Sequence, residues 1–215
     1  MPRYDTIIFD LDGTLLDTLE DLADAVNHAL SQMGMPGRTI DEVRQFVGNG
    51  VAKLMERAVP TGTDPEQTAQ ALAIFKDYYE LHKEDKTAPY AGVVELLSAL
   101  HQRGYKLAVV SNKFDRAVKD LMPRYFPGLI HAAAGEDEDN GVPKKPDPTM
   151  VHRVMAELGA GKAVYIGDSE VDMETARNSG LPCISVTWGF RDRDFLLANG
   201  ADTFADTPAE ILELV

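Results

Sequence analysis

Two acidic residues, Asp10 and Asp12, follow a short apolar run and precede a turn signal at Gly13. The run, Thr6–Phe9, has the composition of a buried strand, so both carboxylates come where that strand should end. Side chains two residues apart in an extended chain lie on the same side, and the two like charges therefore crowd together. A metal ion, a lysine or a bound substrate must compensate them. The alternative is a plain turn at Asp12-Gly13, with Asp10 as a capping residue.

The types of these residues suit phosphoryl transfer. Asp10 could attack phosphorus and form an aspartyl-phosphate, which divides one hard displacement into two easier ones. Asp12 could protonate the leaving oxygen and then deprotonate the attacking water. Gly13 and Thr14 let the chain turn sharply behind the pair, and we take Thr14 as a candidate substrate-binding residue.

A second polar pair, Ser111-Asn112, follows the apolar run Leu107–Val110. A hydroxyl and backbone amides at a strand end can hold phosphate oxygens, which makes both residues candidates for substrate binding. The alternative is an ordinary N-cap before a helix expected over Phe114–Leu121. The adjacent Lys113 either reaches the same site or faces solvent.

Two further acids, Asp168 and Asp172, follow the apolar run Val164–Ile166. Asp172 lies one helical turn after Asp168, and a small cluster of hard oxygen ligands suits Mg²⁺. The alternative is helix capping by Asp168 or Ser169, with acids in the first helical turn.

One basic segment, Lys144–Pro148, stands out in an acidic chain. Its two prolines stiffen the loop and could aim a lysine. A buried ammonium could neutralise both a nucleophilic carboxylate and a phosphate oxygen, and Lys145, attached to Pro146, is the better candidate of the two lysines. The alternative is a surface loop.

Strand-like apolar runs recur along the chain, and helical patterns separate most of them. This alternation predicts an α/β fold with a doubly wound, Rossmann-like parallel sheet covered on both faces. Ligands bind such sheets outside the carboxyl ends of the strands, so the polar groups above should share one edge. The runs are Thr6–Phe9, Leu107–Val110, Ile130–Ala134, Val164–Ile166 and Ile184–Val186.

Between about residues 16 and 85 we find no convincing strand, and apolar residues recur at helical spacing instead. Almost seventy residues is long for one crossover between parallel strands. We therefore expect a helical cap domain at 16–85 and a catalytic core formed by 1–15 and 86–215. The alternative is a run of crossover helices.

Composition narrows the class of protein. The chain has 215 residues, of which 44% are hydrophobic, and a formal net charge of −14, which argues against a general nucleic-acid binder. Its single cysteine, Cys183, allows no internal disulfide, and no apolar stretch is long enough to span a bilayer. We therefore expect a cytoplasmic protein with no membrane partner. We also expect a monomer or homodimer, although the sequence itself does not identify the oligomeric state.

Four motifs of this chain resemble those of the haloacid dehalogenase-like hydrolase superfamily. They are Asp10-Leu-Asp-Gly-Thr14, Ser111-Asn112, Lys145-Pro-Asp-Pro148 and Gly167-Asp-Ser-Glu-Val-Asp172. The resemblance implies Asp10 as nucleophile, Asp12 as general acid/base and Lys145 as the neutralising lysine. It also implies Mg²⁺ held by Asp10, the backbone carbonyl of Asp12 and Asp168, with support from Asp172. The dehalogenases themselves lack the second Asp of the first motif, so Asp12 points to phosphate esters.

Within the superfamily, the chain is most similar to the phosphoglycolate phosphatases, through Phe46–Gly50, Leu54–Arg57, Ser111–Lys113 and Thr187–Phe190. We therefore expect a Mg²⁺-dependent phosphatase that acts on a small phosphorylated metabolite. The alternatives are a pyrophosphatase, nucleotidase or sugar phosphatase, a β-phosphoglucomutase-like phosphomutase, and a non-catalytic regulatory protein, against which the intact motifs count.

Specificity should come from the cap. Gly48, Asn49 and Gly50 either form a tight turn that faces the substrate or a plain turn at a helix start. We predict Gly48 and Asn49 as candidate substrate-binding residues. Some basic side chains could approach a substrate carboxylate or simply be solvated charges: Arg44, Lys53 and Arg57 of this region, and similarly Arg191 and Arg193 after Trp188–Phe190.

Overall fold

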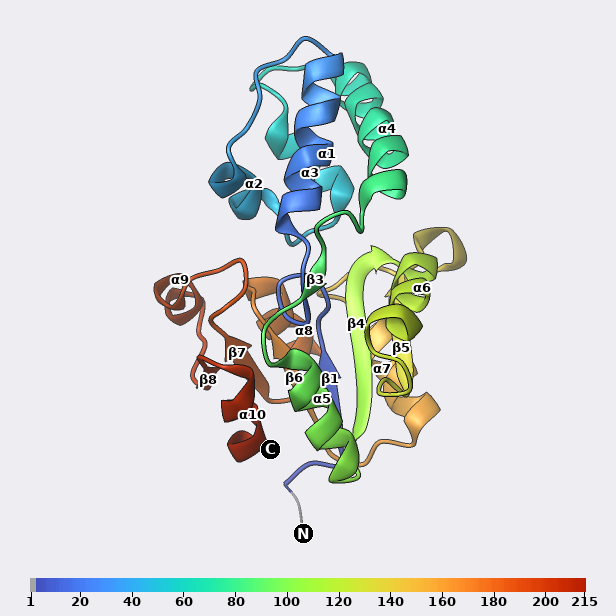
Figure 1. Ribbon diagram of the computed structural model, residues 1–215, viewed down its shortest axis with the longest axis vertical. Coiled ribbons are helices and arrows are strands. Elements are labelled where there is room, and N and C mark those ends of the chain that lie inside the picture. Colours follow the sequence, from blue (N-terminus) through green and yellow to red (C-terminus); the bar gives the residue numbers. More distant parts are fainter. Residues whose placement is uncertain (1–2) are drawn as a thin grey trace. The chain divides into compact units, whose positions relative to one another are not determined.

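The computed structural model describes residues 3–215 (Figure 1). The chain divides into two compact units, a core unit of Met1–Leu16 with Pro89–Val215 and a helical unit of Asp17–Ala88. Two short strands, β2 (Leu16–Asp17) and β3 (Ala88–Pro89), pair with each other at the two points where the chain passes from one unit to the other. Strands of two residues have no periodicity, so the sequence did not predict them.

The core unit is built on a six-stranded parallel sheet, which confirms the predicted fold class. Each strand pairs in parallel with its neighbour. The order is β5 (Ala132–Glu136), β4 (Lys106–Phe114), β1 (Thr6–Phe9), β6 (Ala163–Gly167), β7 (Cys183–Val186) and β8 (Phe204–Ala205). Since β1 lies between β4 and β6, the residues after these three strands meet at the middle of one edge.

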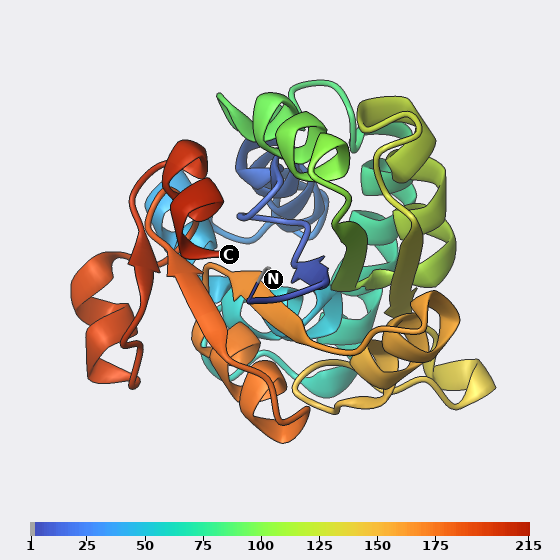
Figure 2. The ribbon, with the colours of Figure 1, turned by 90° about the horizontal axis from the view of Figure 1, so that it is seen from below.

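Helices cover both faces of this sheet (Figure 2). Ile7 and Phe9 pack with α5 (Val93–Gln102), α6 (Asp115–Tyr125) and α10 (Pro208–Leu214). Ile8, between them in the strand, packs with α7 (Thr149–Leu158) and α8 (Glu170–Asn178) on the other face. Successive strand residues point to opposite faces, so an uninterrupted apolar strand fills two cores at once. The other helical segments of the core unit are the 3₁₀ helix η1 (Glu138–Asn140) and α9 (Arg193–Ala198).

Strand β4 is longer than its apolar pattern suggests. We expected it to end at Val110 and a helix to begin at Phe114, but β4 continues to Phe114 and α6 begins at Asp115. Its register with β5 shifts between Ser111 and Phe114. Such a bulge re-aims side chains at the end of a strand, and the two residues inside it are Asn112 and Lys113.

The helical unit consists of α1 (Leu19–Gln32), α2 (Ile40–Phe46), α3 (Val51–Ala58) and α4 (Pro65–His82). Asp21 of α1 is buried and ties the end of the unit to its start. Its carboxylate accepts hydrogen bonds from Lys86 N at 3.0 Å and from Thr87 N and Oγ1 at 2.9 and 2.8 Å. Within residues 3–215, no helix is both long enough and apolar enough to cross a membrane.

Candidate active site

Asp10 extends β1 by one residue, because its backbone N–H donates to Ile166 O of β6 at 2.9 Å. Its carboxylate is nearly buried, and Oδ1 accepts hydrogen bonds from Leu11 N and Lys145 Nζ, both at 2.7 Å. Within the described residues, Oδ2 accepts no hydrogen bond. The side chain is therefore held by one oxygen while the other is available to react.

Lys145 provides the positive charge in this cluster. Only 2% of its side chain is exposed, and Nζ lies 2.7 Å from both Asp10 Oδ1 and Asp172 Oδ1. Asn112 fixes the backbone of Lys145, since its Oδ1 accepts from Lys145 N at 2.6 Å and its Nδ2 donates to Lys145 O at 3.2 Å. We predicted Asn112 as a substrate-binding residue, and the structure gives it this further contact to the lysine loop.

Asp172 lies in the first turn of α8 and is fully buried. Its Oδ1 accepts from Lys145 Nζ and, at 3.4 Å, from Tyr165 Oη. Its Oδ2 accepts from Ser169 N and Oγ at 3.1 and 2.6 Å. Asp172 therefore caps its own helix and orients Lys145 at the same time. The role of Asp172 at a metal stays a prediction.

Asp168 follows β6 and is held from two separate loops. Its Oδ1 accepts from Thr14 Oγ1 at 2.9 Å, and its Oδ2 accepts from Phe190 N at 2.8 Å. The backbone carbonyl of Thr14 accepts in turn from Trp188 Nε1 at 3.0 Å. The loop after β7 thus supports the loop after β1, and both of them position Asp168.

Two glycines allow these loops to approach so closely. Gly13 has a φ of +90°, which favours glycine, and a Cβ there would meet the Asp168 carboxylate. A Cβ on Gly189 would overlap the carbonyl oxygen of Gly13 and the Cβ of Asp168. No side chain fits at position 189 unless the backbone or Asp168 moves.

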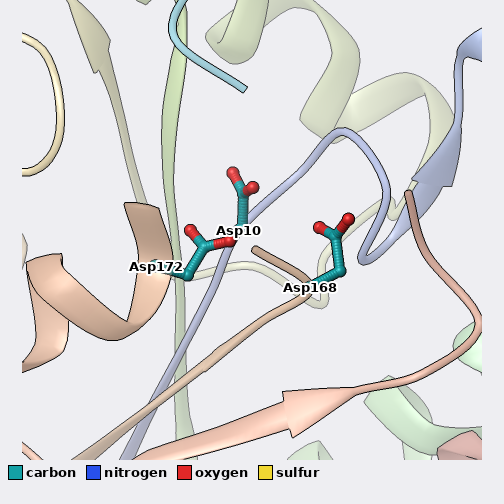
Figure 3. A group of neighbouring side chains, drawn as sticks. All are labelled: Asp10, Asp168 and Asp172. Atoms are coloured by element: carbon teal, nitrogen blue, oxygen red, sulfur yellow. The ribbon is translucent and has the colours of Figure 1, made fainter. Parts of the chain in front are cut away.

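The three carboxylates of Asp10, Asp168 and Asp172 converge (Figure 3): one oxygen from each lies within 4.8 Å of the others. Burial raises the pKa of Asp10 well above its ordinary value, and Asp172 adds to that rise while Lys145 opposes it. Burial, with a further contribution from Asp172, raises the pKa of Asp168 to about 7. Burial by itself would lower the pKa of Lys145, but the carboxylates of Asp10 and Asp172 raise it well above its ordinary value.

Burial and the crowding of like charges act together on these carboxylates. Three buried carboxylates face one buried ammonium, so two negative charges remain uncompensated when all the groups are ionised. A divalent cation would balance them, and carboxylate oxygens are the ligands that hard divalent cations prefer. The residues therefore fit a divalent metal.

We predict that Gly189→Ala weakens metal binding without removing any ligand. The new methyl group forces Asp168 or the Gly13 loop to shift, and displaced supporting contacts typically cost about 10- to 100-fold in metal affinity or activity. Overpacking should also lower the free energy of unfolding by about 1–3 kcal/mol. The half-saturating MgCl₂ concentration for activity and the metal-free melting temperature measure the two effects. Wild-type values of both would show that this close approach is unimportant.

Asp12 pairs with Lys113, which settles the question that the sequence left open for this lysine. Lys113 Nζ lies 3.0 and 3.1 Å from Asp12 Oδ1 and Oδ2. Only 9% of the lysine side chain and 18% of the Asp12 side chain are exposed. Ser111, buried in β4, accepts a hydrogen bond on Oγ from Lys113 N at 3.2 Å.

The candidate cap residues Gly48 and Asn49 lie in the helical unit. Gly48 and Gly50 both have positive φ, and Asn49 between them accepts on Oδ1 from Arg57 Nη2 at 2.8 Å. Arg57 also donates to Phe46 O at 2.7 Å. The turn is therefore braced by an arginine of α3, and roles of Gly48 and Asn49 at a substrate remain predictions.

Known proteins resemble the chain over almost its whole length. The sequence profile of the haloacid dehalogenase-like hydrolase family matches residues 7–186. The chain belongs to this family. A phosphoglycolate phosphatase of Caulobacter vibrioides is 37% identical over 98% of this chain and 92% of its own length, and one of Vibrio vulnificus is 34% identical over 97% and 95%.

Solved structures of proteins similar in sequence have the same fold as this chain. A candidate phosphoglycolate phosphatase from Lactobacillus delbrueckii subsp. bulgaricus has a TM-score of 0.94 and 37% identity, covering 99% of this chain and 98% of its own. A predicted phosphatase from Clostridium acetobutylicum has a TM-score of 0.85 and 27% identity, covering 99% and 100%.

Sequence reasoning missed part of the arrangement within this hydrolase core. The segment Thr187–Phe190 was noted only for its similarity to the phosphoglycolate phosphatases. The hydrogen bonds of Phe190 and Trp188 in the site were not predicted, because contacts made by a loop leave no periodic signal in the sequence. Sequence reasoning also missed that the Thr14 hydroxyl donates to Asp168, while the role of Thr14 at a substrate stays a prediction.

Proposed function

We propose that this hydrolase is a Mg²⁺-dependent phosphatase that uses Asp10 as its nucleophile and prefers 2-phosphoglycolate. The observation that carries the reaction type is the state of the Asp10 carboxylate. One of its oxygens is fixed by a buried lysine and a backbone N–H, while the other accepts no hydrogen bond from the described residues. The names of relatives 31–37% identical over most of the chain support the substrate.

In the first half of the proposed reaction, Asp10 Oδ2 attacks phosphorus and the bond from phosphorus to the leaving oxygen breaks. Asp12 donates a proton to that oxygen, so the product leaves as an alcohol. Lys145 holds Asp10 in place and compensates the charge around the transferring group. Ser111 and Asn112, at the end of β4, are the proposed phosphate-binding residues.

In the second half, Asp12 accepts a proton from water as the water oxygen attacks phosphorus. The bond from phosphorus to Asp10 breaks, and inorganic phosphate and free Asp10 are released. One aspartate therefore serves first as acid and then as base, while the other carries the phosphoryl group.

The proposed metal is Mg²⁺, held by Asp10, Asp168 and the backbone carbonyl of Asp12, with Asp172 in support. When bound, it supplies positive charge that stabilises the phosphoryl oxygens and the nucleophilic carboxylate together. The contacts of Thr14 and Phe190 with Asp168 hold that ligand in one orientation.

The helical unit is proposed as a cap that contributes to selecting the substrate and excludes water during transfer. The single cysteine, Cys183, lies in the core unit as a free thiol. We keep the expectation of a cytoplasmic protein that is a monomer or homodimer.

A substrate panel tests the proposed function. We predict phosphate release from 2-phosphoglycolate with the highest kcat/KM among 2-phosphoglycolate, pyrophosphate, a nucleoside monophosphate and glucose 6-phosphate. Chelation of the metal should abolish release, because the buried carboxylates would then lack their balancing charge. A higher kcat/KM for another member of the panel would overturn the substrate. Isomerisation of a sugar phosphate without free phosphate would instead identify a mutase.

A further inference from the structure

We propose that Lys113 is a specificity-determining residue that binds a carboxylate on the leaving group of the substrate. This inference rests on the proposed function and deepens it. It places part of the selection for an acidic substrate in the core unit, at the end of β4.

The first argument is the position of the ammonium group. Lys113 Nζ lies 3.0 and 3.1 Å from the two oxygens of Asp12, so it contacts the group that is proposed to protonate the leaving oxygen. The leaving oxygen must come within about 2.6–3.2 Å of that acid. Lys113 therefore lies close to the position that the leaving oxygen must occupy.

The second argument is the size of the proposed leaving group. In 2-phosphoglycolate one methylene separates the ester oxygen from the carboxylate, and two single bonds place the carboxylate carbon only about 2.4 Å from that oxygen. A cation that touches Asp12 is therefore within reach of a carboxylate at this distance. Lysine suits such a place, because its compact charge carries three rotatable donors that can serve two anions.

The third argument is enclosure. The Lys113 side chain is 9% exposed, and the bulge in β4 between Ser111 and Phe114 fixes its starting direction. The N–H of Lys113 donates to the buried Ser111 Oγ at 3.2 Å. An ion pair shielded from water gains more from charge complementarity than one in bulk solvent.

The other basic candidates contact other groups. Arg191 pairs with Glu170 and Arg193 pairs with Asp206. Lys145 is engaged at 2.7 Å by both Asp10 and Asp172, so its charge serves the nucleophile. In the helical unit, Arg44 pairs with Asp41 and Lys53 pairs with Glu56, both on half-exposed helix surfaces. Arg57 braces the turn at Asn49.

The test compares two esters that differ in one charge. 2-Phosphoglycolate and 2-hydroxyethyl phosphate have leaving groups of the same length, but only the first carries a carboxylate. We predict that Lys113→Met lowers the ratio of their kcat/KM values about 10- to 100-fold, as expected for a lost charged hydrogen bond, and mainly through KM for 2-phosphoglycolate. Losing the contact with Asp12 affects both esters alike, so only the ratio reports recognition of the carboxylate.

Two further variants keep the result interpretable. Lys113→Arg retains the charge and should keep the ratio within a few-fold of wild type. Lys119→Met removes an equal charge from an exposed ion pair with Asp115 on α6, where 59% of the lysine side chain is exposed, and should leave the ratio unchanged. Thermal unfolding of each variant shows whether it is folded.

The possible outcomes separate the two proposals. If the wild-type enzyme prefers 2-phosphoglycolate and Lys113→Met keeps that preference, Lys113 is not the determinant, while the proposed function stands. If the wild-type enzyme hydrolyses both esters equally well, there is no recognition of the carboxylate, and this inference fails although phosphatase activity remains. If it hydrolyses neither ester with Mg²⁺, the proposed function fails and this inference fails with it.

Discussion

Asp10→Asn is expected to abolish phosphatase turnover, with a loss of about 10⁴-fold or more. The amide has no charged oxygen to attack phosphorus, although its shape and the backbone contact to Leu11 can be kept. Steady-state phosphate release at saturating MgCl₂ measures the effect.

The stability of the same variant separates lost chemistry from lost structure. Burial and the neighbouring Asp172 raise the pKa of Asp10, so the ionised form is disfavoured in the metal-free protein. Removing that charge should leave the free energy of unfolding unchanged or raise it. Asp120→Asn, on an exposed part of α6, is the matched control and should keep both activity and stability. An Asp10→Asn protein with substantial metal-dependent turnover would disprove the role of this residue.

Lys145→Met is expected to have the second-largest effect, because it removes the only ammonium that contacts Asp10 and Asp172 within residues 3–215. Leaving buried charges without their partner typically costs about 3–5 kcal/mol of stability. Turnover should fall about 10³-fold, as for other lost charge-stabilising groups in active sites. Denaturant unfolding and steady-state kinetics measure the two losses.

The neighbouring lysine is a close control for this prediction. Lys144, whose side chain is 26% exposed, pairs at 2.8 Å with Glu138, which is 58% exposed, and its Nζ lies 3.9 Å from the buried Glu136. Partly exposed pairs of this kind contribute far less than buried ones, with exposed pairs at about 0–1 kcal/mol, so Lys144→Met should lose much less stability than Lys145→Met and keep turnover near wild type. Large losses in Lys144→Met together with a near-normal Lys145→Met would reverse the assignment of the two lysines.

The sequence predicted the convergence of the core residues because the underlying pattern is strong. Asp10, Ser111 and Asp168 each follow a buried apolar run, and parallel strands bring their carboxyl ends to one edge. The observed order, with β1 between β4 and β6, places these residues next to one another. Buried strands with an uninterrupted apolar sequence carry this information in their composition alone.

Contacts made by irregular backbone could not be predicted in the same way. The bulge at the end of β4 decides where Lys113 points, and an apolar run that stops at Val110 contains no sign of it. The hydrogen bond from Phe190 N to Asp168 depends on the exact path of a loop, and so does the contact of Asn112 with Lys145. Strand β8 has two residues, which is too few for any periodicity.

Trapping the proposed aspartyl-phosphate tests the central claim most directly. The enzyme is mixed with excess 2-phosphoglycolate and MgCl₂, quenched in acid during turnover and reduced with borohydride, which converts an acyl phosphate to an alcohol. We predict that peptide mass spectrometry finds the aspartate at position 10 converted to homoserine, and finds no conversion when substrate is omitted. Rapid turnover with position 10 unmodified, or with the conversion at Asp12 or Asp168 instead, would contradict the assignment of Asp10 as the nucleophile.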